Sequence, residues 1–244
     1  MKNSVLLALL ILPSAQSAAT YNLAAGWSNA ANPNGVWSYN EGSNPLPFVS
    51  SWLPSFLGPG QQAWAASATG LGHIPVWFLS SITPPGGFDW QIGDVVVHST
   101  DPASGGSAGP SNVTWTSPGD GQIDIGGSVW LGVDRGRGNQ WTILVNGIAL
   151  TGGTLLSGDA YSRASPFFFS LGSGGSGALG NILVSAGDVV MLRLDRNTAF
   201  GEFTGVDLTV TFTSMAEPIP EPASYPLVGF VLLGIGLWLR SKRA

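Results

Sequence analysis

The sequence contains no cysteine, and charged residues make up only 9 % of its 244 residues. The absence of cysteine excludes disulfide frameworks, thiolate zinc sites, cysteine nucleophiles and lipid attachment through an N-terminal cysteine. Glu, Lys and Arg, which dominate coiled coils and long helices, are too scarce here for such architectures. A chain of this length without disulfides depends on a packed core, and 44 % hydrophobic residues with ten tryptophans can supply one.

Positive charge is scarce and unevenly placed. Between residues 20 and 219 there is no lysine, and five arginines accompany thirteen acidic residues, which gives a net charge of −8. Such a body repels polyanions and anionic lipid head groups, so nucleic-acid binding is not expected. Its surface suits neutral partners.

The first 19 residues carry the features of a secretory signal in their usual order. Lys2 provides the positive start, Val5–Leu12 is an unbroken apolar run, and Pro13 with small residues follows. Both Ala15-Gln16-Ser17 and Ser17-Ala18-Ala19 satisfy the small-x-small rule, so two cleavage positions are open. We predict a signal peptide over residues 1–19 that signal peptidase removes; the alternative is a buried first helix.

Residues 215–244 combine three features. Pro220, Glu221 and Pro222 precede an uncharged stretch over residues 223–239, and the cations Arg240, Lys242 and Arg243 follow it. A helix of these 17 residues spans about 26 Å, slightly less than a bilayer core of about 30 Å. The trailing cations favour the cytoplasmic side of the membrane. We predict a transmembrane helix over 223–239, a basic tail over 240–244 and an exported body.

This tripartite end resembles the PEP-CTERM sorting signal of Gram-negative bacteria. The matching parts are Pro220-Glu221-Pro222, the Gly-containing stretch 229–239 and the basic end 240–243, which Ser241 interrupts. The resemblance implies recognition by exosortase, a membrane-embedded cysteine peptidase. It also implies transient anchoring in the inner membrane, then location at the cell surface or outside the cell. The alternative is an ordinary C-terminal membrane anchor.

Residues 20–214 are predicted to form one all-β domain, a single antiparallel β-sandwich. Short β-rich runs alternate with turn residues from Trp90 onward, without an intervening helical pattern. Asn146-Gly147 between apolar runs predicts a hairpin with a type I′ turn. Before Phe88 we expect strands at 36–39 and 75–79 and a short helix at 61–68. The later strands are expected at 94–98, 113–116, 122–133, 141–145, 148–150, 182–185, 189–194 and 206–212.

Three segments, residues 112–121, 141–147 and 184–193, resemble strand pairs of extracellular jelly-roll β-sandwiches, of the kind found among carbohydrate-binding modules. The resemblance covers residues 85–214 and implies a jelly-roll-like body. Many such sandwiches bind sugars, but a fold by itself does not decide function.

Motifs for catalysis are few. Gly105–Gly109 matches G-x-S-x-G, with His98 and Asp101 near it in sequence, but a β-rich run follows where a nucleophile elbow requires a helix. Gly93-Asp94 opens a strand and is interpreted as a turn, because Asp bonds to its own backbone. No pattern places two carboxylates in one cleft, as glycoside hydrolysis requires. We predict that the protein is not an enzyme.

Metal-binding patterns are equally sparse. His73 and His98 are the only histidines, and they are not spaced as a helical pair. Oxygen ligands for calcium occur without the spacing of a dedicated loop, at Asp120, Asp124, Asp195 and Asn197. No cofactor is expected, and a structural calcium is the one metal left open.

Aromatic side chains are the remaining candidates for binding, because flat rings stack on the apolar faces of sugars. The candidate carbohydrate-binding residues are Trp37, Tyr39, Trp77 and Trp90. The opposing interpretation places them in the core, since each large aromatic buries roughly 150–250 Å². The binding hypothesis predicts that at least one of the four is exposed in a flat or concave patch. Its ligand would be a neutral or cationic glycan, because the body is acidic.

These observations predict an exported, exosortase-sorted protein of the cell envelope or extracellular matrix, non-catalytic and either structural or carbohydrate-binding. The resemblance to PEP-CTERM proteins implies a link to exopolysaccharide and biofilm. Expected partners are signal peptidase, exosortase, the membrane through the C-terminal helix, and extracellular polysaccharide for a binding module. The alternative is a secreted polysaccharide hydrolase or lyase, which requires two acids converging in a cleft.

Overall fold

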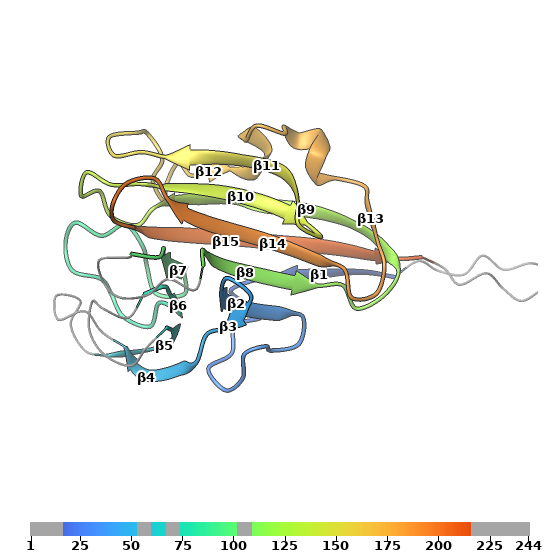
Figure 1. Ribbon diagram of the computed structural model, residues 1–244, viewed down its shortest axis with the longest axis horizontal. Coiled ribbons are helices and arrows are strands. Elements are labelled where there is room, and N and C mark those ends of the chain that lie inside the picture. The colour runs from blue at the N-terminus through green and yellow to red at the C-terminus, as the bar shows by residue number, and fades with distance from the viewer. Residues whose placement is uncertain (1–16, 53–59, 67–73, 102–108, 216–244) are drawn as a thin grey trace, which may run out of the picture. The chain divides into compact units, whose positions relative to one another are not determined.

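The computed structural model describes residues 17–52, 60–66, 74–101 and 109–215, which form two antiparallel sheets (Figure 1). The six-stranded sheet contains, in spatial order, β11 (Ile148–Leu155), β10 (Asn139–Val145), β14 (Val189–Arg196), β8 (Ser111–Thr116), β2 (Trp37–Glu41) and β3 (Asn44–Pro45). The nine-stranded sheet contains β12 (Phe167–Phe168), β9 (Gly121–Leu131), β15 (Phe203–Ser214), β7 (Val95–His98), β6 (Val76–Leu79), β5 (Gln61–Ala65) and β4 (Phe48–Trp52). In the same sheet, β13 (Ile182–Val184) pairs with β9 and β1 (Ala18–Asn22) pairs with β15. The prediction of an all-β fold is confirmed.

The strands expected from Trp90 onward are all present. The predicted hairpin joins β10 to β11, and both turn residues have positive φ, 50° at Asn146 and 80° at Gly147. The helix expected at 61–68 is wrong, because Gln61–Ala65 is β5, which pairs with β4 and β6. Gln and Ala are good helix formers, but intrinsic propensity is a weak determinant, and pairing with two neighbouring strands overrides it.

The main core lies between the two sheets, which Figure 1 shows one behind the other. Trp115, Trp141 and Leu192 of the six-stranded sheet meet Val129 and Leu208 of the nine-stranded sheet in one buried cluster. A second buried cluster lies on the other face of the nine-stranded sheet, where β6 and β7 contribute Phe78 and Val96. Strands β6 and β7 are therefore covered on both faces, which explains their continuous apolar sequence.

Two long strands, β9 and β15, lie side by side in the nine-stranded sheet. The other edge of each one is occupied by two short strands placed end to end: β12 and β13 beside β9, and β7 and β1 beside β15. Along β15, Val206, Leu208 and Val210 belong to the core between the sheets, so Asp207 and Thr209 face outward. This outward face carries the candidate site.

Two short 3-10 helices, η2 (Phe169–Leu171) and η3 (Ser176–Leu179), follow β12. The segment between them bonds to β11, with Ser173 N–H donating to Gly152 O over 2.9 Å and Gly174 N–H to Thr151 Oγ1 over 3.1 Å. This Gly/Ser-rich stretch covers part of the free edge of β11, a position that would otherwise expose unpaired backbone groups.

The compact unit runs from Ser17 to Ser214, so it begins three residues before the predicted domain start at residue 20. Its two ends meet, because Ser214 N–H donates to Ser17 O over 3.0 Å. Pro220, Glu221, Pro222, the predicted helix over 223–239 and the cations Arg240, Lys242 and Arg243 lie outside the described residues, as do residues 1–16. Within the described ranges, no helix is long and apolar enough to cross a membrane.

Candidate functional site

All four aromatic residues predicted to bind carbohydrate are buried. The exposed fraction is 2 % for Trp37, 0 % for Tyr39, 0 % for Trp77 and 4 % for Trp90. The expectation that at least one of them is exposed is therefore wrong. Trp37, Tyr39 and Trp77 pack between the sheets, and Trp90 packs in the second cluster against Phe203. Burial also raises the pKa of the Tyr39 hydroxyl.

For the three residues on strands, the physical reason is that side chains alternate between the two faces, and Trp37, Tyr39 and Trp77 stand at inward positions. Trp37 and Tyr39 are two residues apart on β2 and both face the other sheet. Trp37 borders a hollow of about 390 Å³ beside β1, but nearly all of its ring is covered. These rings provide packing area between the sheets in place of a ligand platform.

His98 is a neutral core histidine. Its Nδ1–H donates to Ser99 O over 2.8 Å, and its ring lies edge-on to Phe203 at 4.6 Å between ring centres. Burial lowers the pKa of His98 to about 4. The residues 102–108, which include most of the Gly105–Gly109 motif, and His73 lie outside the described residues.

The aspartates considered for calcium have local partners. Asp120 accepts the Ala186 N–H over 2.9 Å, Asp124 accepts the Asn181 N–H over 2.8 Å, and Asp195 pairs with Arg193 at 2.8 Å. Across residues 17–52, 60–66, 74–101 and 109–215, no three His, Cys, Asp or Glu side chains gather to hold a metal ion.

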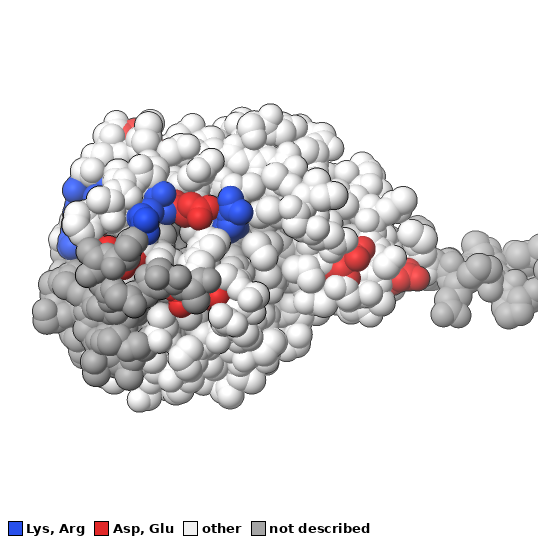
Figure 2. All heavy atoms as spheres, in the orientation of Figure 1, with Lys and Arg blue, Asp and Glu red and all other residues white. Residues whose placement is uncertain are grey.

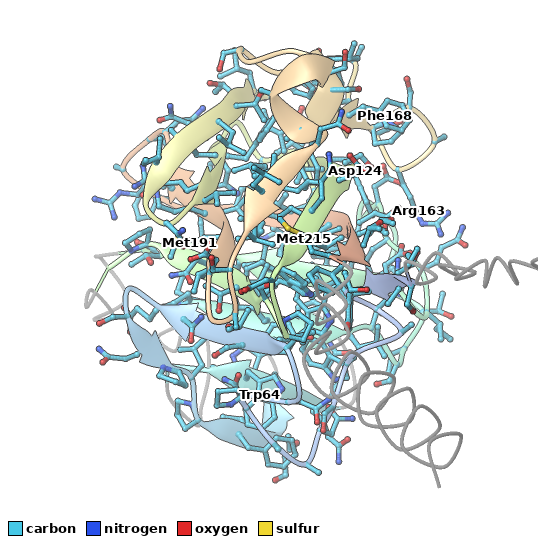
Figure 3. All side chains as sticks on the ribbon, turned by 90° about the vertical axis from the view of Figure 1, so that its right-hand side faces the viewer. Trp64, Asp124, Arg163, Phe168, Met191 and Met215 are labelled. Carbon is cyan, nitrogen blue, oxygen red and sulfur yellow. The ribbon has the colours of Figure 1, made fainter. Side chains whose placement is uncertain are left out.

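A different surface combines an exposed ring with charged side chains. On the outward face of the nine-stranded sheet, Phe168 of β12, Ser128 of β9 and Asp207 of β15 form one row across three strands. These residues line a hollow of about 290 Å³ together with Trp130, Arg163 and Asp94. We call it the Phe168 hollow. Figure 3 shows Arg163 and Phe168 on one side of the domain, with Met191 of the six-stranded sheet on the opposite side.

A tight turn presents Arg163 to the hollow. Ser162 and Ser165 exchange two backbone hydrogen bonds, of 3.1 and 3.0 Å, around the tip that carries Arg163. The Arg163 guanidinium donates two hydrogen bonds to the Asp94 carboxylate, from Nε to Oδ2 over 2.6 Å and from Nη2 to Oδ1 over 3.1 Å. The Asp94 carboxylate raises the pKa of Arg163 further above its ordinary value. The backbone N–H of Arg163 also donates to the Asp89 carboxylate over 2.7 Å. Three hydrogen bonds to aspartates therefore fix the position of Arg163.

Phe168 is held outward by its two neighbours. Phe167 stacks on Tyr161 at 4.3 Å between ring centres and contacts Trp141 edge-on, and Phe169 is fully buried against Trp141. Because the flanking rings both point into the protein, the Phe168 ring points out and is 50 % exposed. An exposed ring that is anchored on both sides needs little ordering when it binds a ligand.

The wall beside Phe168 contains the indole of Trp130. Trp130 of β9 pairs with Gly205 of β15, and a Cβ atom at position 205 would come within 2.1 Å of the indole ring. Glycine at position 205 therefore lets the indole lie across β15. The indole N–H donates to Asp89 O over 2.6 Å, which fixes the ring.

The sequence carried signals for this site that local pattern analysis did not use. Three consecutive phenylalanines at 167–169 cannot all point to the same face of a strand, so one of them is exposed unless both faces are covered. Asp94 was assigned a turn role, and it does accept the Gln91 N–H over 2.7 Å. Its pairing with Arg163, 69 residues away, depends on tertiary structure.

The outer face of the six-stranded sheet carries a second hollow of about 500 Å³, lined by Gln140, Thr142, Thr151, Ser173 and Arg193 among others. Figure 2 shows this face to be mostly uncharged, with a short row of charged side chains and separate charged groups toward its edges. The hollow has no aromatic ring in its lining. It therefore lacks the combination of flat ring and charged groups found in the Phe168 hollow.

The comparisons with known proteins give no relative. No protein-family model, no curated protein and no solved structure matches this chain.

Proposed function

We propose that the protein is an exported, non-catalytic component of the cell envelope or extracellular matrix, sorted by exosortase and associated with exopolysaccharide. The signal-like first 19 residues and the Pro220-Glu221-Pro222, apolar stretch and basic end support this proposal. So does the acidic, lysine-free body, which repels anionic surfaces.

One structural observation carries the proposal. The strands form a body between Ser17 and Ser214, and these two residues are hydrogen-bonded to each other. The two proposed address segments therefore adjoin, in sequence, ends of the domain that are bonded to each other. Removal of residues 1–17 leaves β1 whole, whereas removal of residues 1–19 also takes Ala18 and Ala19 from that strand.

The finer assignment of a jelly-roll-like sandwich also remains a proposal. It is supported by the way the last two strands insert between earlier ones: β14 lies between β10 and β8, and β15 lies between β9 and β7. A strand that returns over a long connection to lie beside an early strand is typical of Greek-key topologies, from which jelly rolls are built.

Sorting is tested by changing the motif in the native host. Glu221→Ala should leave an exported chain that stays in the membrane fraction at its unprocessed length, as seen by fractionation and immunoblotting. Deletion of residues 240–244 should also give an exported but misprocessed chain. The matched control is Glu217→Ala, which changes the same residue type just before the motif and should be processed normally. Normal release of the Glu221→Ala protein would contradict the sorting assignment.

A further inference from the structure

We propose that the Phe168 hollow is a binding site for a sugar unit without acidic groups, at the end or within a chain of an extracellular glycan. The inference rests on the proposed function for the glycan's presence, but the site is argued from its own geometry. It replaces the buried aromatic residues as the place where this body meets carbohydrate.

The hollow offers the two kinds of contact that a sugar ring needs. Phe168, which is 50 % exposed, supplies a flat apolar surface onto which the C–H groups of a pyranose face can pack, and the buried Trp130 supports the wall beside it. Arg163 and Asp207 supply donors and acceptors for hydroxyl groups. Polar and apolar groups share the exposed lining in similar measure, which suits the mixed surface of a sugar.

Two of the polar groups, Arg163 and Asp207, have binding capacity left and are already in position. A guanidinium carries five N–H donors, and Asp94 accepts two from Arg163, so three remain for a ligand. Asp207 is exposed, and its carboxylate makes one long bond of 3.4 Å with the Asn22 amide. Sugar hydroxyls both donate and accept, so they can use the arginine and the aspartate together.

Charge excludes acidic ligands from this hollow. The single guanidinium is already paired with Asp94, while Asp89 and Asp207 add two further carboxylates. A uronic acid, sulfate or phosphate group would face net negative charge, and the acidic body as a whole adds to that repulsion. Neutral sugars and amino sugars do not meet this electrostatic repulsion.

The volume fits a small ligand portion. At about 290 Å³ the hollow lies just below the range for pockets that bury drug-sized ligands, roughly 300–1,000 Å³. It can therefore take one sugar unit, with the rest of the chain outside. A single shallow contact of this size is expected to bind with a dissociation constant in the millimolar range.

The test uses the full-length protein in a zwitterionic, sugar-free detergent. The probes are hexamers of β-1,4-glucose, β-1,3-glucose, β-1,4-mannose, N-acetylglucosamine and glucosamine, with hexamers of galacturonate and guluronate as acidic probes. Binding is measured by saturation-transfer NMR and titration. We expect at least one non-acidic hexamer to bind, with little change in affinity of a neutral hexamer between low and high salt, because stacking is not screened.

Variants locate the contact. Phe168→Ala should weaken binding about tenfold, and Phe168→Tyr, which keeps a flat ring, should retain it. The matched control is Leu183→Ala on β13. Leu183 is 70 % exposed and pairs with the same strand β9, but it lies about 20 Å along that strand. Circular dichroism confirms that each variant is folded.

Four results would overturn the proposal: no non-acidic hexamer binds the folded protein, acidic hexamers bind more tightly, Phe168→Ala binds like the parent, or Leu183→Ala weakens binding as much as Phe168→Ala does. None of these results affects sorting, which the Glu221→Ala experiment measures separately. A protein that is sorted normally but binds no sugar would defeat this inference and leave the proposed function standing.

Discussion

At the scale of single residues, two buried titratable side chains near one end of the domain give opposite pH dependences. Burial lowers the pKa of His98 to about 4, below its ordinary value of 6.5. Burial raises the pKa of Glu202, whose Oε2 has no hydrogen-bond partner in the described part of the chain. Their effects on stability have opposite signs.

We expect His98 to make the folded state less stable in mild acid. Above pH 6.5 the histidine is neutral in both states and contributes no pH dependence. Between about pH 6.5 and 4 the unfolded chain takes up a proton that the folded chain does not, so the free energy of unfolding falls by about 3 kcal/mol in total. Urea unfolding followed by tryptophan fluorescence at a series of pH values measures this fall.

Two variants separate the contributions to this profile. His98→Asn keeps an N–H donor near Ser99 O without a titrating group, so the fall should disappear. Glu202 binds its proton more tightly in the folded state, so acidification through its raised pKa adds stability and offsets part of the histidine effect. Glu202→Gln removes that offset and should steepen the fall. An unchanged profile in His98→Asn would show that another group is responsible.

At the scale of the elements, one side chain joins the two sheets. Asn139 of β10 is fully buried and reaches the nine-stranded sheet, where its amide donates to Glu202 O over 2.8 Å and to Thr204 Oγ1 over 2.7 Å. Its oxygen accepts the Ser99 hydroxyl, just after β7. Asn139→Ala removes three bonds and leaves their partners buried, so unfolding should become easier by about 3 kcal/mol. Thermal and urea unfolding measure this loss.

The matched control is Asn197→Ala, because Asn197 is exposed and its side chain makes a single long bond, 3.4 Å to Leu155 O. This substitution should lower the free energy of unfolding by less than about 0.5 kcal/mol. Equal losses in the two variants would contradict the assigned role of Asn139.

At the scale of the whole molecule, the pairing of the chain ends favours one of the two cleavage positions predicted for the signal peptide. Strand β1 begins at Ala18, and all five residues to Asn22 pair with β15. Cleavage after Ser17 leaves this strand whole, whereas cleavage after Ala19 removes the two pairs that Ala18 and Ala19 make with Thr213 and Phe212. We therefore expect the exported protein to begin at Ala18. N-terminal sequencing or intact-mass measurement checks this, and a chain beginning at Thr20 would contradict it.

The local chemistry of the sequence determined the all-β class, the later strands and the Asn146-Gly147 hairpin. Alternation along a strand and positive φ at a two-residue turn are properties of neighbouring residues, so they are readable without knowledge of the partner strands. The same patterns did not reveal which aromatic rings are exposed. Trp77 and Phe78 are adjacent on β6, yet both are buried, because that strand is covered on its two faces.

Tertiary structure alone decided the candidate site. The Phe168 hollow unites Asp94, Ser128, Arg163 and Asp207, residues from separate strands and a turn that no spacing in the sequence links. Strand pairing sets the row of Phe168, Ser128 and Asp207, since the register of β9 against β12 and β15 places them side by side. Pairing register depends on which strands meet and which face is buried, and both are settled only when the whole core packs.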